Sequence, residues 1–284
     1  MIQYLYLGRV DYSEGLRLQD EFSALVAEGR LHNVLLLLEH PPVLTLGRNA
    51  NRANVLASDE LLAARDVTLH EINRGGDVTY HGPGQLVGYP IFDLRTLHNP
   101  NGGRMGPVDF VRGMEEALIR LCAGFGVRAG RVEGLTGVWC AARGGPLVES
   151  SATGPERKIG AIGIHVAKGI TSHGFAFNVT TDLRDFELII PCGIPDHAVT
   201  SLERELAREV AHRKELPSLE IVAHQAARQF GLVFDQQVLA VESLADLRAQ
   251  AAAAAPAYPA EDTPLRVPAE VDRLRSATEP PVRA

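Results

Sequence analysis

The sequence predicts an α/β or α+β fold in which a mixed sheet is flanked by helices. Short apolar runs of strand length dominate the middle of the 284-residue chain, and segments with helical spacing of apolar residues surround them. Hydrophobic residues make up 45% of the chain and charged residues 22%, a balance typical of a globular protein with a sizeable core. We find no internal repeat in the sequence.

The first third of the chain predicts two helices and three strands. Residues 11–29 have apolar residues on one helical face and end at a glycine, and Ser58 caps a short second helix that ends near Ala64. The strands are expected at the apolar runs NVLLLLEH (33–40), VLTLG (43–47) and VTLHEINR (67–74).

The rest of the chain predicts further strands with helices between and after them. A helix is expected over 108–125, where Val111, Met114 and Leu118 recur at helical spacing. Two more helices are expected over 201–210 and 219–230. The strands are expected at LVGYPIFDL (86–94), GVWC (137–140), KIGAIGIHV (158–166), HGFAFNVT (173–180) and FELIIP (186–191).

Two segments differ in composition from this core. Residues 141–157 are rich in Gly, Pro and Ser and predict a long inserted surface loop between two strands. Residues 236–284 contain an alanine run and several prolines but no phenylalanine, which predicts a low-complexity, flexible tail that begins at most with a short helix. We therefore place the catalytic domain at residues 1–235 and expect the tail to be dispensable.

Charge and cysteine content exclude several classes of protein. A net charge of −7 argues against a nucleic-acid binder, and no apolar run approaches the ~20 residues that span a bilayer. The N-terminus lacks the features of a secretory signal, so a cytoplasmic protein is expected. The odd count of three cysteines argues against a disulfide framework or a cysteine zinc site. Cys122 and Cys140 are expected to be buried as small hydrophobic residues.

Cys192 differs from the other cysteines because it lies in the turn sequence Pro191-Cys192-Gly193. Proline fixes its own φ angle and glycine tolerates unusual backbone angles, so the run predicts a turn that presents the thiol at the rim of a sheet. A single cysteine is usually structural, and a catalytic thiol needs a group that favours its thiolate. Lys158 would do so as an ammonium ion or would accept the thiol proton as a neutral amine. The alternative is that Lys158 is simply a solvated lysine at a strand edge.

The run RGGDVTYHGPGQ, starting at Arg74, contains four glycines and predicts a loop whose backbone approaches a ligand closely. It matches no phosphate-binding pattern, and a simple bend is the alternative. His81 in this loop is interpreted as a proton shuttle, a thiol partner or a hydrogen-bonding strut. The small or apolar residues Ala161-Ile162-Gly163 and Gly174-Phe175-Ala176 would line a narrow slot for an alkyl chain or would simply pack in the core. No metal site is expected, because the histidines lack ligand spacing.

Four ordered segments, RGGDVTYHGPGQLVGYP, KIGAIGIHV, HGFAFNVTTDL and FELIIPCGIPDHAVTSL, resemble the lipoyl(octanoyl) transferase family over roughly residues 5–234. The resemblance implies a single domain of the biotin/lipoate protein ligase type. It implies transfer of an octanoyl group from octanoyl-acyl carrier protein to a lysine of lipoyl domains in 2-oxoacid dehydrogenase complexes and the glycine cleavage H protein. No cofactor is implied, because passage from thioester to thioester to amide is downhill without ATP.

The resemblance also implies roles for individual residues. The cysteine that carries the acyl thioester corresponds to Cys192, and the lysine that tunes it corresponds to Lys158. The substrate contacts that it implies are Arg74, Gly75, Gly76, Asp77, Val78, Thr79, Tyr80, His81, Ala161, Ile162, Gly163, Gly174, Phe175 and Ala176. Either Lys158 or His81 would take the proton of the attacking lysine. Two alternatives remain: an ATP-dependent lipoate or biotin ligase on the same fold, and a catalytically silent module that binds carrier protein or lipoyl domains.

Overall fold

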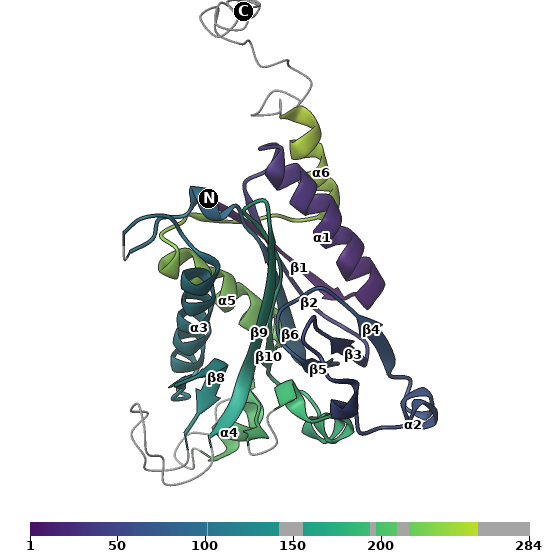
Figure 1. Ribbon diagram of the computed structural model, residues 1–284. Helices are drawn as coiled ribbons and strands as arrows, with labels where there is room; N and C mark the ends of the chain where they lie inside the picture. Colours follow the sequence, from purple (N-terminus) through teal and green to yellow (C-terminus); the bar gives the residue numbers. More distant parts are fainter. Residues whose placement is uncertain (101, 142–155, 194–196, 209–215, 255–284) are drawn as a thin grey trace, which may run out of the picture.

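The computed structural model describes residues 1–100, 102–141, 156–193, 197–208 and 216–254. Within them, a nine-stranded mixed sheet forms the centre of the molecule, with strand order β12-β1-β2-β6-β10-β9-β8-β7 and β11 paired to β9 (Figure 1). Its strands are β1 (Ile2–Arg9), β2 (Asn33–Glu39), β6 (Gln85–Ile91), β7 (Gly130–Val132), β8 (Leu135–Cys140), β9 (Arg157–Ala167), β10 (Ile170–Asn178), β11 (Ala198–Val199) and β12 (Val238–Ala240). The mixed α/β class expected from the sequence is confirmed.

Helices cover both faces of this sheet, and the strand β2 shows why. Its residues are apolar almost throughout, as in strands that are buried on both faces. Val34, Leu36 and Leu38 pack in one core cluster with α1 (Tyr12–Ala27) and α6 (Leu244–Ala253). Leu35 and Leu37 pack on the other face with α3 (Pro107–Gly124) and α5 (Leu219–Val233). The alternation of side chains along β2 thus joins two cores through one strand.

A smaller sheet of order β4-β3-β5 lies beside the large one, with strands β3 (Val43–Leu46), β4 (Thr68–Glu71) and β5 (Val78–His81). The short helix α2 (Asp59–Ala64) belongs to this part, and the Ser58 side chain caps it by accepting a hydrogen bond from the Leu61 amide, as expected. The short helix α4 (Leu202–Arg208) follows β11. The small sheet carries the glycine-rich loop on one side and contributes the third core cluster.

One expectation from the sequence is wrong here. Residues 186–191 do not form a strand: a 3-10 turn spans Leu183–Leu188, and only Ile189 makes an isolated bridge, to Val55. Beyond residue 235, β12 pairs with β1 in parallel, and Leu247 of α6 is fully buried against α1 and β2. Most of the inserted loop (142–155) and the tail beyond residue 254 lie outside the described residues.

Replacing Leu247 with alanine should therefore destabilise the whole domain. The side chain is completely buried, so we expect the Leu247→Ala variant to lose about 2–5 kcal/mol of unfolding free energy through lost burial and a residual cavity. Leu239→Ala is the control, because Leu239 is 46% exposed on β12 and should change stability by roughly 0.5 kcal/mol or less. Equal urea midpoints for the two variants would show that α6 is not part of the cooperative unit.

Candidate active site

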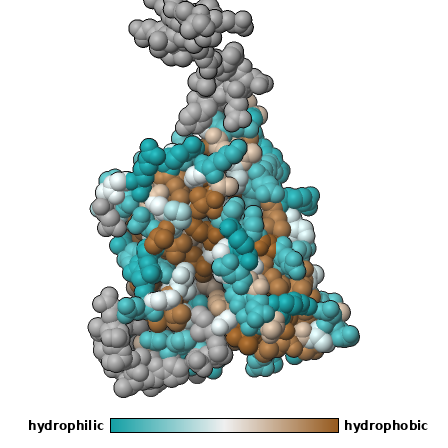
Figure 2. All heavy atoms as spheres, in the orientation of Figure 1, coloured by the Kyte–Doolittle hydropathy of each residue, from teal (hydrophilic) through white to brown (hydrophobic). Residues whose placement is uncertain are grey.

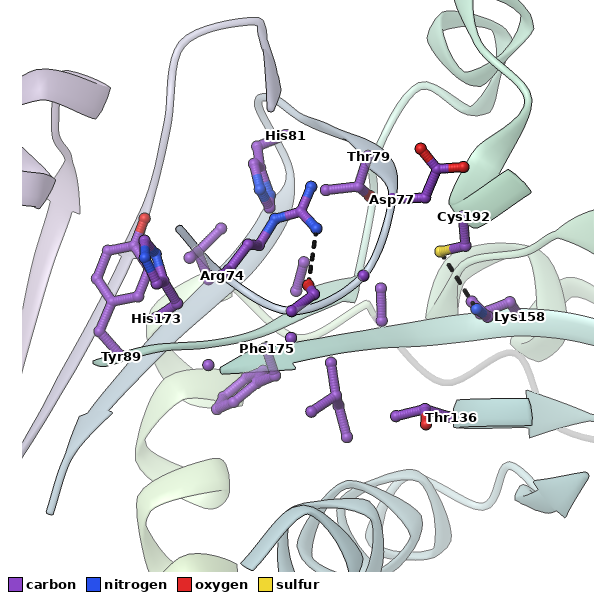
Figure 3. Close-up of a pocket in the computed structure, with 18 of the residues that line it drawn as sticks. Arg74, Asp77, Thr79, His81, Tyr89, Thr136, Lys158, His173, Phe175 and Cys192 are labelled. Carbon is purple, nitrogen blue, oxygen red and sulfur yellow. Dashed lines mark hydrogen bonds between the residues drawn. The ribbon is translucent and has the colours of Figure 1, made fainter. Parts of the chain in front are cut away.

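A pocket of about 340 Å³ lies between the glycine-rich loop and the β9–β10 hairpin (Figure 3). Cys192 and Lys158 lie at one end, Tyr89 and His173 at the opposite end, and Arg74 between them. Fourteen of the sixteen sequence-predicted site residues line it: Arg74, Gly75, Gly76, Asp77, Thr79, His81, Lys158, Ala161, Ile162, Gly163, Gly174, Phe175, Ala176 and Cys192. The volume is in the range typical of small-molecule sites.

Cys192 is held in a strained backbone conformation. Its φ of 57° and ψ of 18° lie in the left-handed region, which costs a residue with a side chain roughly 1–2 kcal/mol. The turn is fixed from outside, because the Ile190 amide donates to the Asn54 carbonyl at 2.7 Å and the Gly193 amide donates to the Ile190 carbonyl at 3.0 Å. Such strain persists only where the surroundings hold it, and it is often found at active sites.

Lys158 meets the thiol directly. Its Nζ donates to the Cys192 Sγ at 3.3 Å, and the residue is only 7% exposed, so it is not a solvated lysine at a strand edge. Lys158 comes from β9, which is paired on both sides at this point: Trp139 of β8 is its cross-strand neighbour and Val199 of β11 lies opposite. An ammonium group at this distance favours the thiolate form of the cysteine.

The thiols of the other two cysteines, Cys140 and Cys122, are unreactive because burial keeps them protonated. Burial raises the pKa of the Cys140 thiol to about 12, with a further contribution from the nearby carboxylate of Glu205. Burial likewise raises the pKa of Cys122 well above its usual range. Both side chains, one from α3 and one from β8, are buried in the same core cluster, as expected for small hydrophobic residues. Cys192 is the half-buried thiol among the three.

The glycine-rich loop forms the roof of the pocket and is tied down at two points. The Gly75 amide donates to the Ile164 carbonyl of β9 at 2.9 Å. The buried Arg74 guanidinium donates to the backbone carbonyl of Thr45 at 2.7 Å and to its hydroxyl oxygen at 2.8 Å. The loop approaches the sheet closely because Gly163 has no side chain: a Cβ there would lie 2.7 Å from the Gly75 carbonyl oxygen.

Adding a methyl group at Gly163 should therefore push the glycine-rich loop away from the sheet. We expect Gly163→Ala to weaken use of the acyl donor that the sequence resemblance implies roughly tenfold or more, because backbone atoms of the loop must move and the positioning of the acyl chain suffers. Gly124→Ala is the control, since nothing lies within 4 Å of the added Cβ. Cys192 alkylation should be nearly unchanged in both variants, and unaltered donor kinetics in Gly163→Ala would contradict the prediction.

Strand β5 divides the predicted loop residues between two environments. Thr79 and His81 line the pocket, whereas Val78 and Tyr80 point to the opposite side and are buried in the third core cluster. Tyr80 also donates its hydroxyl hydrogen to the Asp185 carboxylate at 2.7 Å. Side chains alternate along a strand, so a loop assignment for residues 78–81 wrongly gave all four to the pocket.

A chain of side-chain amides fixes the tautomer of His81. Asn178 Nδ2 donates to the Thr200 carbonyl at 2.9 Å, and Gln85 Nε2 donates to the Tyr80 carbonyl at 3.1 Å and to Asn178 Oδ1 at 2.9 Å. The two backbone carbonyls can only accept, so they orient both amides. Gln85 Oε1 then accepts from His81 Nδ1 at 2.8 Å, which assigns the hydrogen to Nδ1 and leaves Nε2 as an acceptor.

Three buried histidines should make the fold sensitive to acid. Burial lowers the pKa of His81 to about 3 and that of His40 and His173 to about 4, below the ordinary value of 6.5. The unfolded chain therefore binds more protons than the folded one as the pH falls from about 6.5 towards 4. We expect urea unfolding to show stability lost in this window, at up to about 1.4 kcal/mol per pH unit for each histidine.

The control for this prediction is the exposed His32, whose replacement by glutamine should leave the slope unchanged. Carboxylates whose pKa is lowered by ion pairing, such as Asp182 at about 2 beside Arg184, contribute only at lower pH. A stability that stays constant between neutral pH and pH 5 would argue that the histidines are solvated.

Sequence reasoning missed several residues of the pocket wall. These are Tyr12 of α1, Val87 and Tyr89 of β6, Gly134 of the β7–β8 turn, Leu135 and Thr136 of β8, and His173 of β10. The Tyr89 hydroxyl is bonded to His40 Nε2 at 2.7 Å, and His173 Nε2 is bonded to Asn73 Oδ1 at 2.6 Å. His173 also has a left-handed φ of 56°, which gives no signal in the sequence.

Beyond Gly160, β9 has no β8 partner in the described residues. The half-buried Ile162, Ile164 and Val166 lie along this stretch, where β9 pairs with β10 on one side and the Gly75 amide bonds the Ile164 carbonyl. Figure 2 shows hydrophobic surface gathered around β9 in this view. The exposed Gly134 and Thr136 flank the pocket.

No group of three or more His, Cys, Asp or Glu side chains within the residues that the structure describes has the arrangement of a metal site. None of the described helices is long and apolar enough to cross a membrane.

The sequence matches the lipoyl protein ligase A/B catalytic domain over residues 11–220. The octanoyltransferase of Acidobacterium capsulatum is 59% identical over 87% of this chain and 96% of its own length. That of Koribacter versatilis is 48% identical over 96% of this chain and 97% of its own length. Among solved structures, a bipartite lipoate protein ligase from Thermoplasma acidophilum is 16% identical, with a TM-score of 0.61 over 89% of this chain and 91% of its own. A lipoate-protein ligase A bound with ATP gives 0.59 at 14% identity, covering 89% and 93%. At these identities the structures show the fold alone.

Proposed function

The chain belongs to the lipoyl protein ligase A/B catalytic-domain family, among its octanoyltransferases, and from this premise we propose that Cys192 carries the octanoyl group. The donor is octanoyl-acyl carrier protein and the acceptor is a lysine of a lipoyl domain. The observation that carries the proposal is the contact of Lys158 Nζ with Cys192 Sγ at 3.3 Å, at the end of a pocket lined by small and apolar residues.

In the first half-reaction the Cys192 thiolate attacks the carbonyl carbon of the octanoyl thioester. The tetrahedral intermediate collapses, the bond to the phosphopantetheine sulfur breaks, and the leaving thiolate takes a proton from the Lys158 ammonium. The products are acyl-Cys192, neutral Lys158 and the free carrier thiol. The octanoyl chain lies along Ala161, Gly163 and Ala176 beneath the glycine-rich loop.

In the second half-reaction the neutral amine of the target lysine attacks the acyl-Cys192 carbonyl. The nitrogen loses a proton to the Lys158 amine, the amide forms, and Cys192 leaves as a thiolate beside the restored ammonium. Lys158 is better placed for this transfer than His81, whose Nδ1 hydrogen is bound by Gln85 and whose pKa burial lowers to about 3. The cycle ends in the state in which it began, and no ATP is consumed.

We propose that the catalytic domain extends to residue 254, since β12 and α6 belong to the same cores as the strands that hold the pocket. We propose that Arg74, Gly75, Gly76, Asp77, Thr79 and the small residues of β9 and β10 that line the pocket contact the substrate. Val78 and Tyr80 support the loop from the core side.

Intact-protein mass spectrometry tests the proposal. The purified chain is mixed with octanoyl-acyl carrier protein without ATP, and the peptides are then mapped. We expect an octanoyl adduct on Cys192 that disappears when a lipoyl domain is added and reappears on the domain lysine. Transfer that requires ATP and survives in Cys192→Ala would instead indicate a ligase, and a stable complex without an adduct would indicate a binding module.

A further inference from the structure

The ring of Trp139 lies against the Lys158 ammonium group. Lys158 Nζ is 4.5 Å from the centre of the Trp139 ring, and the two residues are direct cross-strand partners in β8 and β9. Trp139 is fully buried. A cation near an aromatic face is attracted by the negative charge of that face, and the attraction grows when both groups are shielded from water.

The contact between Lys158 and Trp139 matters because no carboxylate in the described residues pairs with Lys158. Within the described residues Lys158 forms no salt bridge with a carboxylate: Glu205 pairs with Arg157, Asp77 is bound by Asn51 and Asn54, and Glu156 lies 3.9 Å from His197. From the catalytic turn the charged or titratable group that faces it is Cys192. The remaining polar neighbours in the small cavity behind the pair, Thr79, Gln85 and Asn178, are uncharged.

A buried lysine without an anionic partner tends to lose its proton. When the pair shares a single proton, it can rest as thiol and amine or as thiolate and ammonium, and the first form is inactive towards a thioester. An aromatic face stabilises the ammonium form and does little for the neutral amine. The ring therefore favours the reactive form of the pair.

We propose that Trp139 is a positioning residue that keeps the proton on Lys158 and holds the ammonium against Cys192. The inference rests on the proposed roles of Cys192 and Lys158. It also applies to the second half-reaction, in which a more basic Lys158 is a better acceptor for the proton of the attacking amine. Nothing in this role requires Trp139 to touch the substrate.

Simple core packing is the alternative role, since Trp139 also contacts the His197 ring at a centroid distance of 5.1 Å and an interplanar angle of 67°. Removing the ring altogether would disturb packing and electrostatics together. Fluorination separates them, because fluorine atoms nearly preserve the shape of the ring but withdraw charge from its face. Trp139 is the single tryptophan of the chain, so biosynthetic incorporation of fluorinated tryptophans alters this ring alone.

Because the chain contains few lysines, the protonation of Lys158 can also be measured selectively. The chain has three lysines, Lys158, Lys168 and Lys214, so protein labelled with isotopes in lysine gives few side-chain signals in NMR spectra. The titration is followed in Cys192→Ser protein, where no thiolate competes with the ring for Lys158. We expect the protonation midpoint of Lys158 to fall step by step as fluorine atoms are added, by roughly one pH unit across the series, a tenfold change in the equilibrium.

Two controls are built into the experiment. The exposed Lys168 should titrate at the same pH in every sample, and Trp139→Phe, which keeps a weaker aromatic face, should give an intermediate midpoint. A Lys158 midpoint that does not change with fluorination would overturn the proposal. Because the measurement needs no turnover, it can fail while acyl-Cys192 forms as expected, and it can succeed even if the acyl donor is misidentified.

Discussion

Replacing Cys192 with serine should abolish octanoyl transfer, with a loss of roughly a thousandfold or more in turnover. A serine hydroxyl beside Lys158 is far less ionised than a thiol at neutral pH, so the nucleophile is lost while the shape of the turn is kept. The left-handed backbone at this position is strained for serine as it is for cysteine, and the fold should be unaffected. Single-turnover assays with octanoyl-acyl carrier protein, read by mass spectrometry, measure the effect.

The matched control is Cys122→Ala, which removes a buried thiol from α3 far from the pocket. We expect this variant to keep its turnover and to lose about 1 kcal/mol of stability through the small void that it creates. Near-normal transfer by Cys192→Ser, with the protein folded, would eliminate the thioester intermediate. Loss of activity in both variants would show only that the core tolerates no change.

The strands that carry the site were predictable because each has a pattern that works over a few residues. The run NVLLLLE is apolar on both faces and therefore marks a strand between two helical layers. The run FELIIP is equally apolar, yet it forms a 3-10 turn whose Phe186, Leu188 and Ile189 pack into the third core cluster. Short apolar runs do not distinguish strand from turn, because burial of their side chains is the same in both.

The C-terminal part of the domain escaped prediction for a different reason. Strand β12 has three residues, and α6 is so rich in alanine that it has no pronounced apolar face. Their place in the fold depends on pairing with β1 and packing on α1, at the opposite end of the sequence. Such long-range partners leave no local periodicity, so composition alone suggested a tail.

The reactive groups of the site could be identified from the sequence, but several of the residues that surround them could not. Cys192 and Lys158 stand out through their neighbours in the chain, whereas Tyr12, Tyr89 and His173 reach the pocket only because β6, β10 and α1 meet there. The support of the catalytic turn by Asn54 is likewise a tertiary contact. Local motifs identify groups that react, and topology decides which groups surround them.

Replacing Lys158 with methionine should slow the alkylation of Cys192 by iodoacetamide at neutral pH, because no ammonium group then favours the thiolate. Methionine keeps the apolar bulk beside Trp139 but removes the charge 3.3 Å from the sulfur. The acylation rate at neutral pH should fall in step with the loss of thiolate, by roughly tenfold to a thousandfold. Rates of alkylation measured at neutral pH give the loss directly, and an unchanged rate would remove Lys158 from the pair.

Lys158→Arg separates the two roles of this lysine. Arginine remains positively charged but cannot give up its proton, so it can stabilise a thiolate and cannot accept a proton from the attacking amine. If Lys158 acts in both half-reactions, the arginine variant should recover most of the alkylation rate and form acyl-Cys192, yet pass the acyl group to the lipoyl domain slowly. Recovery of both steps would limit Lys158 to its charge, and the base of the second half-reaction would then have to be sought among the other pocket residues, with the Nε2 acceptor of His81 first.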